Sequence, residues 1–248
     1  MTLKLQSQLI GHTRDEMKIS FVSKFKTKNI EATVKKFGFD VVRKNPDFVL
    51  CYGGDGTVLL SERIFPGIPK IIIKRGSALC RRCDYTISHL KLILEKIIRG
   101  KYKIVKEIKL TARSKNKSLT GLNEIQVHNK ILTRAIRFSL KIDGRKIYNL
   151  LGDGVIFATP FGSTAYYSST GGKPFKKGIG ISFNNLHYLT TKRKMKSFVV
   201  SDNSKIEIKI KRGPAWVFSD NDKRFIEIDK GDKIIIQKSK EFAKFVFI

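Results

Sequence analysis

The chain has 248 residues, 41% of them hydrophobic, which is enough for one large domain or two smaller ones with a substantial core. Fifty Lys and Arg residues against 21 Asp and Glu give a formal net charge of +29, which predicts attraction to polyanions such as nucleic acid, polyphosphate or nucleotides. The composition excludes general disorder, and no apolar run approaches the roughly 20 residues that cross a membrane.

The N-terminus and the cysteine content together favour a cytoplasmic protein. Residues 1–10 lack the apolar core and the cleavage site of a signal peptide. Three cysteines cannot all pair within one chain, which favours a reducing compartment. Cys80 and Cys83 form a single C-x-x-C pair, too few ligands for a structural zinc site. Redox chemistry and incidental thiols both stay open for this pair.

The first hundred residues alternate between strand and helix patterns. Strands are predicted at 19–22, 39–42, 48–51 and 71–73, with helices at 30–37, 58–65 and 90–97. Gly38 and Gly100 are placed to end the first and last of these helices. This alternation predicts an α/β nucleotide-binding domain with a parallel sheet over residues 1–100.

A glycine turn, Gly53-Gly54-Asp55-Gly56-Thr57, lies between an apolar strand and a helical pattern. The glycines allow close approach of a ligand, and the start of the helix offers amide groups to an anion. A carboxylate at Asp55 would repel phosphate, so it could instead accept a proton from a hydroxyl or hold a magnesium ion. The alternative is that Asp55 only forms the turn or caps the helix.

From about Lys101 the hydrophobic period changes to two. Residues 108–112, 136–142 and 206–210 alternate between apolar and polar, and 234–236 is another apolar run. The pair Asp143-Gly144 predicts a hairpin turn. We therefore expect an all-β second domain of mostly antiparallel strands over residues 101–248, with its last strands able to pack back on the first domain.

Two further motifs lie in this second half. Asn123 and Glu124 offer an amide and a carboxylate that could read ribose hydroxyls or an amino-purine edge, although two polar residues at the mouth of a strand are the simpler interpretation. The stretch 152–172 is more distinctive. A Gly-Asp-Gly turn starts a strand there, and Thr159-Pro160 ends it. Gly162–Ala165 is then predicted to open a helix, whose hydroxyl and amide groups suit a nucleotide.

These motifs, in this order and spacing, resemble the NAD kinase family over residues 18–248. Gly53–Thr57 matches the GGDGT of that family, and Asn123-Glu124 matches its NE. Asp153-Gly154 and Thr159–Tyr166 match its DG…TPTGSTAY, and Gly171-Gly172 match the glycines that follow. GGDGT alone is weakly specific, because diacylglycerol-type lipid kinases and phosphofructokinases are similar there.

The resemblance implies transfer of a phosphoryl group from ATP, or polyphosphate, to the 2′-hydroxyl of the adenosine ribose of NAD, with Mg²⁺ or another divalent cation. It also implies a homo-oligomer, dimer or tetramer, and it assigns no metal ligands. Asp55 would be the catalytic base. The residues implied to bind NAD are Asp55, Gly56, Asn123, Glu124, Asp153, Phe161, Thr164, Ala165, Tyr166 and Ser169. The residues implied to bind phosphate are Gly53, Gly54, Gly56 and Thr57.

The chain departs from the family pattern at several positions. Residues 74–83 replace the usual Gly-Ile-Asn and Leu-Gly-Phe-Leu, Phe161 replaces a threonine, and Leu151 stands where a basic residue is often found. Near the C-terminus the usual Asp-Gly is Asp220-Asn221. These departures leave open the phosphate donor and the choice between NAD and NADH.

Two other functions compete with NAD phosphorylation. A lipid or sugar kinase could share the GGDGT turn, but it would leave Asn123-Glu124 and Gly162–Tyr166 without a role. A basic nucleic-acid-binding protein on a kinase-like scaffold is suggested by the charge of +29 and by the run Lys192–Lys196. The charge alone supports non-specific polyanion binding.

Overall fold

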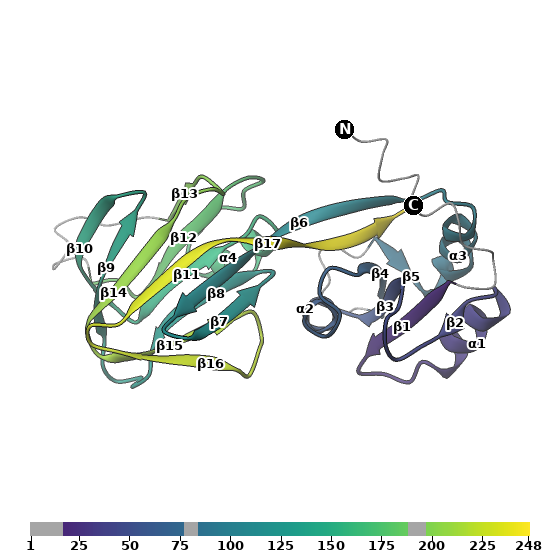
Figure 1. The fold of residues 1–248 in the computed structure, drawn as a ribbon, viewed down its shortest axis with the longest axis horizontal. Helices are drawn as coiled ribbons and strands as arrows, with labels where there is room; N and C mark the ends of the chain where they lie inside the picture. The colour runs from purple at the N-terminus through teal and green to yellow at the C-terminus, as the bar shows by residue number, and fades with distance from the viewer. Residues whose placement is uncertain (1–16, 77–83, 188–196) are drawn as a thin grey trace. The chain divides into compact units, whose positions relative to one another are not determined.

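The structure, a computed structural model, describes residues 17–76, 84–187 and 197–248. Its chain divides into two compact units (Figure 1). The first runs to Lys106 and takes in Ala243–Ile248, and the second is Glu107–Phe242. The last residues of the chain therefore belong with the first ones.

The first unit is built on a parallel sheet whose strands alternate with helices. Its strand order is β2-β1-β3-β4, and both β5 and the end of β17 lie beside β4. Every one of these pairs is parallel. The elements are β1 (Lys18–Ser23), α1 (Lys28–Lys36), β2 (Asp40–Val41), β3 (Phe48–Gly53), α2 (Asp55–Ile64), β4 (Pro69–Lys74), β5 (Tyr85–Thr86), the 3-10 turn η1 (Ile87–His89), α3 (Leu90–Ile98) and β17 (Lys233–Phe247).

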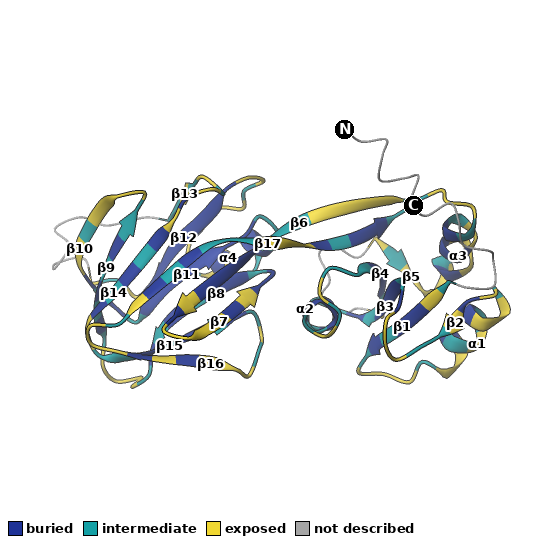
Figure 2. Cartoon of the chain, in the orientation of Figure 1, coloured by how far each residue is buried: buried dark blue, intermediate teal, exposed yellow. Residues whose placement is uncertain are grey.

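Helices cover both faces of this sheet, which explains why β3 is apolar without alternation. On one face Leu50 packs in a cluster with Val34 of α1 and Leu94 of α3. On the other face Val49 and Cys51 pack against residues from α2 and the loop after it. Neighbouring residues of a strand point to opposite faces of the sheet. Because helices cover both faces, the residues of β3 that point either way are buried (Figure 2).

The second unit consists of two layers of antiparallel strands. One layer has the order β10-β9-β14-β17, and the other has the order β13-β12-β11-β8-β15-β16. Its elements are β6 (Lys103–Ser114), β7 (Lys117–Gly121), β8 (Glu124–Asn129), β9 (Ile136–Ile142), β10 (Arg145–Gly152), β11 (Gly154–Ala158), η2 (Phe161–Thr164), α4 (Tyr166–Ser169), β12 (Ile179–Asn184), β13 (Phe198–Val200), β14 (Ile206–Arg212), β15 (Pro214–Ser219) and β16 (Phe225–Asp229). Strands β6 and β17 each begin in one unit and end in the other.

The core of this unit lies between the layers. Ile208 of β14 and Phe138 of β9 are buried in one cluster with Val127 of β8 and Phe157 of β11. Only one face of β9 and β14 is buried, so their sequences alternate. The predicted fold class, a parallel α/β part followed by mostly antiparallel strands, is confirmed.

The predicted turns are confirmed, whereas one predicted helix is different. Gly38 and Gly100 end α1 and α3 with φ of 84° and 64°, and Asp143-Gly144 turns from β9 into β10. The helix expected from Gly162 is instead the 3-10 turn η2 followed by a single helical turn, α4. Ala165, with φ −94° and ψ −129°, interrupts the helical path between them. No helix in the described ranges is long and apolar enough to span a membrane.

Candidate functional site

The glycine turn lies where β3 ends and α2 begins. Gly54 is the N-cap of α2, and its carbonyl accepts the backbone N–H groups of Thr57 and Val58 at 2.9 and 3.2 Å. A Cβ atom at Gly53 would lie 2.3 Å from Oγ1 of Thr57, so any other residue there would force the Thr57 side chain to move. Because Gly54 is the N-cap, Asp55 is the first helical residue and lies in the first turn of α2.

Asp55 and Gly56 are partly exposed, whereas the Thr57 side chain is buried. The turn lies beyond the carboxyl end of a central parallel strand, the usual place for ligands in such sheets. The first N–H groups of a helix point out of its N-terminal end, where they favour an anion. The turn thus combines one carboxylate with backbone donors, as proton transfer next to a phosphate requires.

In the second unit, Leu122 and Asn123 form the turn between β7 and β8, and Glu124 begins β8. The carboxylate of Asp220 holds this turn. Its Oδ2 accepts the N–H of Leu122 at 2.8 Å, and its Oδ1 accepts those of Asn123 and Glu124 at 2.7 and 3.1 Å. The backbone N–H of Asp220 donates in return to the Glu124 carbonyl at 3.1 Å.

The carboxyl group of Glu124 is buried, with 4% of the residue exposed. Within the described residues its Oε2 has no hydrogen-bond partner, and its Oε1 accepts only a long bond of 3.5 Å from Nε2 of Gln126. Burial, and secondly the negative charge of Asp220, raise the pKa of this carboxyl to about 8, against a small opposing effect of Gln126. Near neutral pH Glu124 therefore carries a proton and can donate as well as accept.

The segment 159–162 is bonded directly to the Asn123-Glu124 turn. Thr159 donates from its hydroxyl to the carbonyl of Leu122 at 2.6 Å and from its N–H to that of Asn123 at 2.9 Å. The N–H of Gly162 donates to Oγ1 of Thr159 at 3.0 Å. A Cβ atom at Gly162 would lie 2.2 Å from the Asn123 carbonyl oxygen. The predicted Asn123-Glu124 motif and the predicted segment that begins at Thr159 are thus held together by hydrogen bonds.

The remaining predicted residues of this segment follow in η2 and α4. Phe161, Thr164 and Ala165 are half-buried, while Tyr166 and Ser169 are exposed, with 57% of Tyr166 accessible. These five residues follow Thr159 and Gly162, the two residues of the segment that contact the backbone of Leu122 and Asn123.

A cavity of about 630 Å³ opens beside α4. It is lined by His128, Tyr166, Ser169, Thr170, Phe183, Asn184 and Asn185. Asp153 is tied to this cavity, because Nδ2 of Asn185 donates to its Oδ2 at 2.7 Å. Its lining includes the polar side chains of His128, Asn184 and Asn185.

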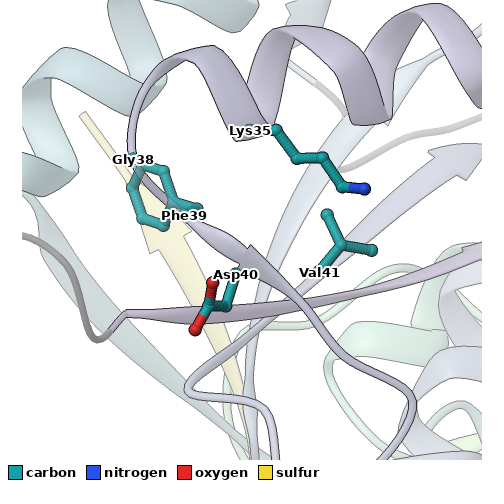
Figure 3. A pocket seen from close by; sticks show the side chains of 5 residues that line it. All are labelled: Lys35, Gly38, Phe39, Asp40 and Val41. Carbon is teal, nitrogen blue, oxygen red and sulfur yellow. The ribbon is translucent and has the colours of Figure 1, made fainter.

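A smaller hollow of about 330 Å³ lies in the first unit beside the end of α1 (Figure 3). It is lined by Lys35, Gly38, Phe39, Asp40 and Val41. None of the predicted site residues belongs to it, and Lys35, Gly38 and Asp40 are exposed. It offers no convergent buried polar groups.

The structure thus gathers Asn123, Glu124 and residues 161–169 in the second unit, with Asp153 bonded to a residue of the adjacent cavity. The glycine turn with Asp55 belongs to the first unit. Sequence reasoning missed His128, Asn184 and Asn185, which carry no motif, and it treated Asp220 only as a departure. Cys80, Cys83 and Lys192–Lys196 lie outside the described residues.

Comparison with known proteins gives consistent results. Residues 122–248 match the family model described as the ATP-NAD kinase C-terminal domain. The chain is 30% identical over 214 residues to the NAD kinase of Thermoplasma acidophilum, covering 84% of this chain and 76% of that relative.

The fold is similar to two crystal structures. One is yeast NADH kinase complexed with NADH, with a TM-score of 0.81, 17% identity, and coverage of 94% of this chain and 84% of that one. The other is an NAD kinase from Archaeoglobus fulgidus in complex with ATP, with a TM-score of 0.78, 24% identity, and coverage of 93% and 92%. At these identities the likeness shows the fold.

Proposed function

The chain belongs to the NAD kinase family, and we propose that it transfers the terminal phosphoryl group of ATP to the 2′-hydroxyl of the adenosine ribose of NAD, giving NADP. The observation that carries this proposal is the buried carboxyl of Glu124, whose Oε2 has no partner in the described part of the chain. Such a group is costly unless a ligand completes its hydrogen bonds.

In this proposal the second unit binds the dinucleotide. Asn123 and Glu124 bond to ribose hydroxyls or the purine edge, because an amide and a protonated carboxyl can each donate and accept. The exposed ring of Tyr166 offers a flat surface for stacking of a base. Asp153 and Ser169 contact the dinucleotide around the cavity, together with Phe161, Thr164 and Ala165.

The first unit supplies the catalytic turn. Asp55 takes the proton of the 2′-hydroxyl while that oxygen forms a bond to the terminal phosphorus of ATP and the bond from phosphorus to the ADP oxygen breaks. The N–H groups of the turn Gly53–Thr57 stabilise charge on the transferred phosphoryl group. We expect Mg²⁺, or another divalent cation, to enter with the triphosphate, since it is usually held by one or two carboxylates and the phosphates of the substrate.

The positive charge of the chain supports this assignment, because both substrates are anionic. Polyphosphate is the alternative donor and NADH the alternative acceptor. A homo-oligomer, dimer or tetramer, is part of the proposal and is tested by the mass of the protein in solution.

The test is an assay of purified protein with NAD or NADH, Mg²⁺, and ATP or polyphosphate. We expect NADP to form in step with ADP, and Asp55→Asn to abolish most of it. Phosphorylation of a lipid or a sugar without NADP would instead favour the other kinases. Salt-sensitive DNA binding without NADP would favour the nucleic-acid-binding alternative.

A further inference from the structure

The three amides that Asp220 binds belong to consecutive residues, Leu122, Asn123 and Glu124. A carboxylate suits this task because it only accepts hydrogen bonds and has two oxygens to share among the donors. One side chain therefore fixes the peptide planes on both sides of Asn123 and the start of β8. The direction in which the Asn123 and Glu124 side chains leave the backbone depends on it.

The surrounding backbone is shaped for this contact. Asp220 has φ of 49°, in the left-handed region that Asp and Asn tolerate better than most residues. Gly121 leaves the space on the other side, since a Cβ atom there would lie 2.5 Å from the Glu124 carbonyl oxygen and 3.1 Å from Oδ1 of Asp220. The left-handed backbone of Asp220 and the missing side chain of Gly121 thus both allow the Asp220 carboxylate to reach the turn.

We propose that Asp220 is a positioning residue, which fixes Asn123 and Glu124 in the orientation that binds the dinucleotide. The inference rests on the proposed function, because Asn123 and Glu124 are there assigned to NAD. Asp220 acts by holding these two residues in place, and it takes no part in the phosphoryl transfer itself.

The charge of Asp220 provides a second way to test this role, through the pKa of Glu124. It is the charged group that raises the pKa of Glu124, after the larger effect of burial. The strands that pair with β8, which are β11 and β15, and the turn η2 contain no ionisable side chain, and the neighbour on β8 is the neutral Gln126. The strand β7 carries Lys117, whose side chain is exposed at the far end of that strand. Removing the charge of Asp220 should therefore lower the pKa of Glu124.

The protonation of Glu124 matters for an anionic ligand. Its neutral carboxyl can donate a hydrogen bond and does not repel a pyrophosphate, whereas the ionised form can only accept and repels it. Affinity for NAD should therefore fall as the pH rises through about 8, the pKa of Glu124. This fall should move to lower pH when the charge of Asp220 is removed.

The experiment compares wild type with Asp220→Asn, Gly121→Ala and the control Asp229→Asn. Asp229 is an exposed residue at the end of β16, in the same unit. We measure the KM for NAD, the KM for ATP and kcat from pH 6 to 9, and hydrogen exchange at the amides of Leu122–Glu124.

Asp220→Asn should raise the KM for NAD about ten- to hundredfold, the effect of losing charged hydrogen bonds, with the KM for ATP little changed. Its pH transition should lie lower than in wild type, and exchange at the three amides should be faster. Gly121→Ala, which disturbs the geometry but keeps the charge, should raise the KM for NAD without moving the transition. Asp229→Asn should resemble wild type in all these measurements.

The inference would be overturned if Asp220→Asn had the same KM for NAD and the same pH transition as wild type. The proposed function would still stand in that case, as long as wild type forms NADP. If wild type forms no NADP, the proposed function fails instead. Direct NAD binding and the amide exchange then decide the role of Asp220, since neither needs turnover. Equal exchange and equal NAD affinity in Asp220→Asn and wild type would reject it.

Discussion

Gly162 and Asn123 are so close that only a hydrogen atom fits between them: a Cβ atom at position 162 would lie 2.2 Å from the Asn123 carbonyl oxygen and 2.5 Å from its Cα atom. The contact joins η2 to the turn between β7 and β8. Because both neighbours are backbone atoms that cannot rotate away, residue 162 must be glycine for the two motifs to keep this relative position.

Gly162→Ala should therefore displace η2 from Asn123 and raise the KM for NAD more than tenfold. Such overpacking typically costs about 1–3 kcal/mol of stability. Steady-state kinetics and urea unfolding measure the two effects. Gly100→Asn is the control, since its site is open and its φ of 64° suits Asn. A KM for NAD equal to that of wild type in Gly162→Ala would show that the contact does not set the binding geometry.

Asp55→Asn should lower kcat by about 10²- to 10⁴-fold, the usual contribution of a general base. The variant keeps the size of the side chain but cannot take the proton of the ribose hydroxyl. Because Gly54 and not Asp55 is the N-cap of α2, and asparagine keeps the shape of the side chain, we expect the thermal midpoint to stay close to that of wild type. Asp47→Asn, in the same unit, is the control. Near-normal turnover in Asp55→Asn would leave the residue as a part of the turn only.

The pattern of the sequence predicted the fold because it reports local burial. The alternation of Ile206, Ile208 and Ile210 is visible without a structure since one face of β14 is solvated. The unbroken apolar run of β3 indicated a strand covered on both faces. The turn around Asp55 was found for the same reason, since its glycines stand between a clear strand and a clear helix.

The parts that could not be predicted depend on contacts between distant residues. Asp220 reaches the amide of Asn123 across 97 positions of the chain, and nothing local to Asp220 indicates that contact. The raised pKa of Glu124 needs burial and a second carboxylate, neither visible in the sequence around it. Lys70 is fully buried beside Glu62, although both residue types are usually exposed.

Replacing one partner of that buried pair should strongly destabilise the first unit. Nζ of Lys70 is paired with Glu62 and donates to the Phe65 carbonyl at 2.7 Å, and Oε1 of Glu62 accepts the N–H of Gly67 at 3.1 Å. Lys70→Met leaves the Glu62 carboxylate buried without its cation, which should cost about 3–5 kcal/mol of unfolding free energy. Urea unfolding measures this.

The double variant Lys70→Met with Glu62→Gln is the control for the pair. It removes both charges, so it should recover a large part of the loss. Equal stability of the single variant and wild type would mean that the pair contributes little. Further destabilisation by the second substitution would show that Glu62 acts mainly through its bond to Gly67.

The raised pKa of Glu124 also predicts how the stability of the protein depends on pH. The unfolded chain releases this proton near the ordinary value of 4.5, and the folded protein releases it near 8. Between these values the folded state binds more protons than the unfolded state, so the free energy of unfolding should fall as the pH rises. Above pH 8 both states are ionised, and the loss contributed by this group is complete.

Glu124→Gln should remove this contribution, because glutamine resembles the protonated carboxyl and does not titrate. We expect the variant to match wild type near pH 5 and to be the more stable of the two near pH 8. Urea unfolding of both proteins at several pH values between 5 and 8.5 tests this. Gln126→Ala is the control, since the weak bond at 3.5 Å has only a small effect on that carboxyl. If the stability difference between Glu124→Gln and wild type were the same at every pH, the carboxyl would already be ionised in the folded protein at pH 5, and its role as a donor to the dinucleotide would be wrong.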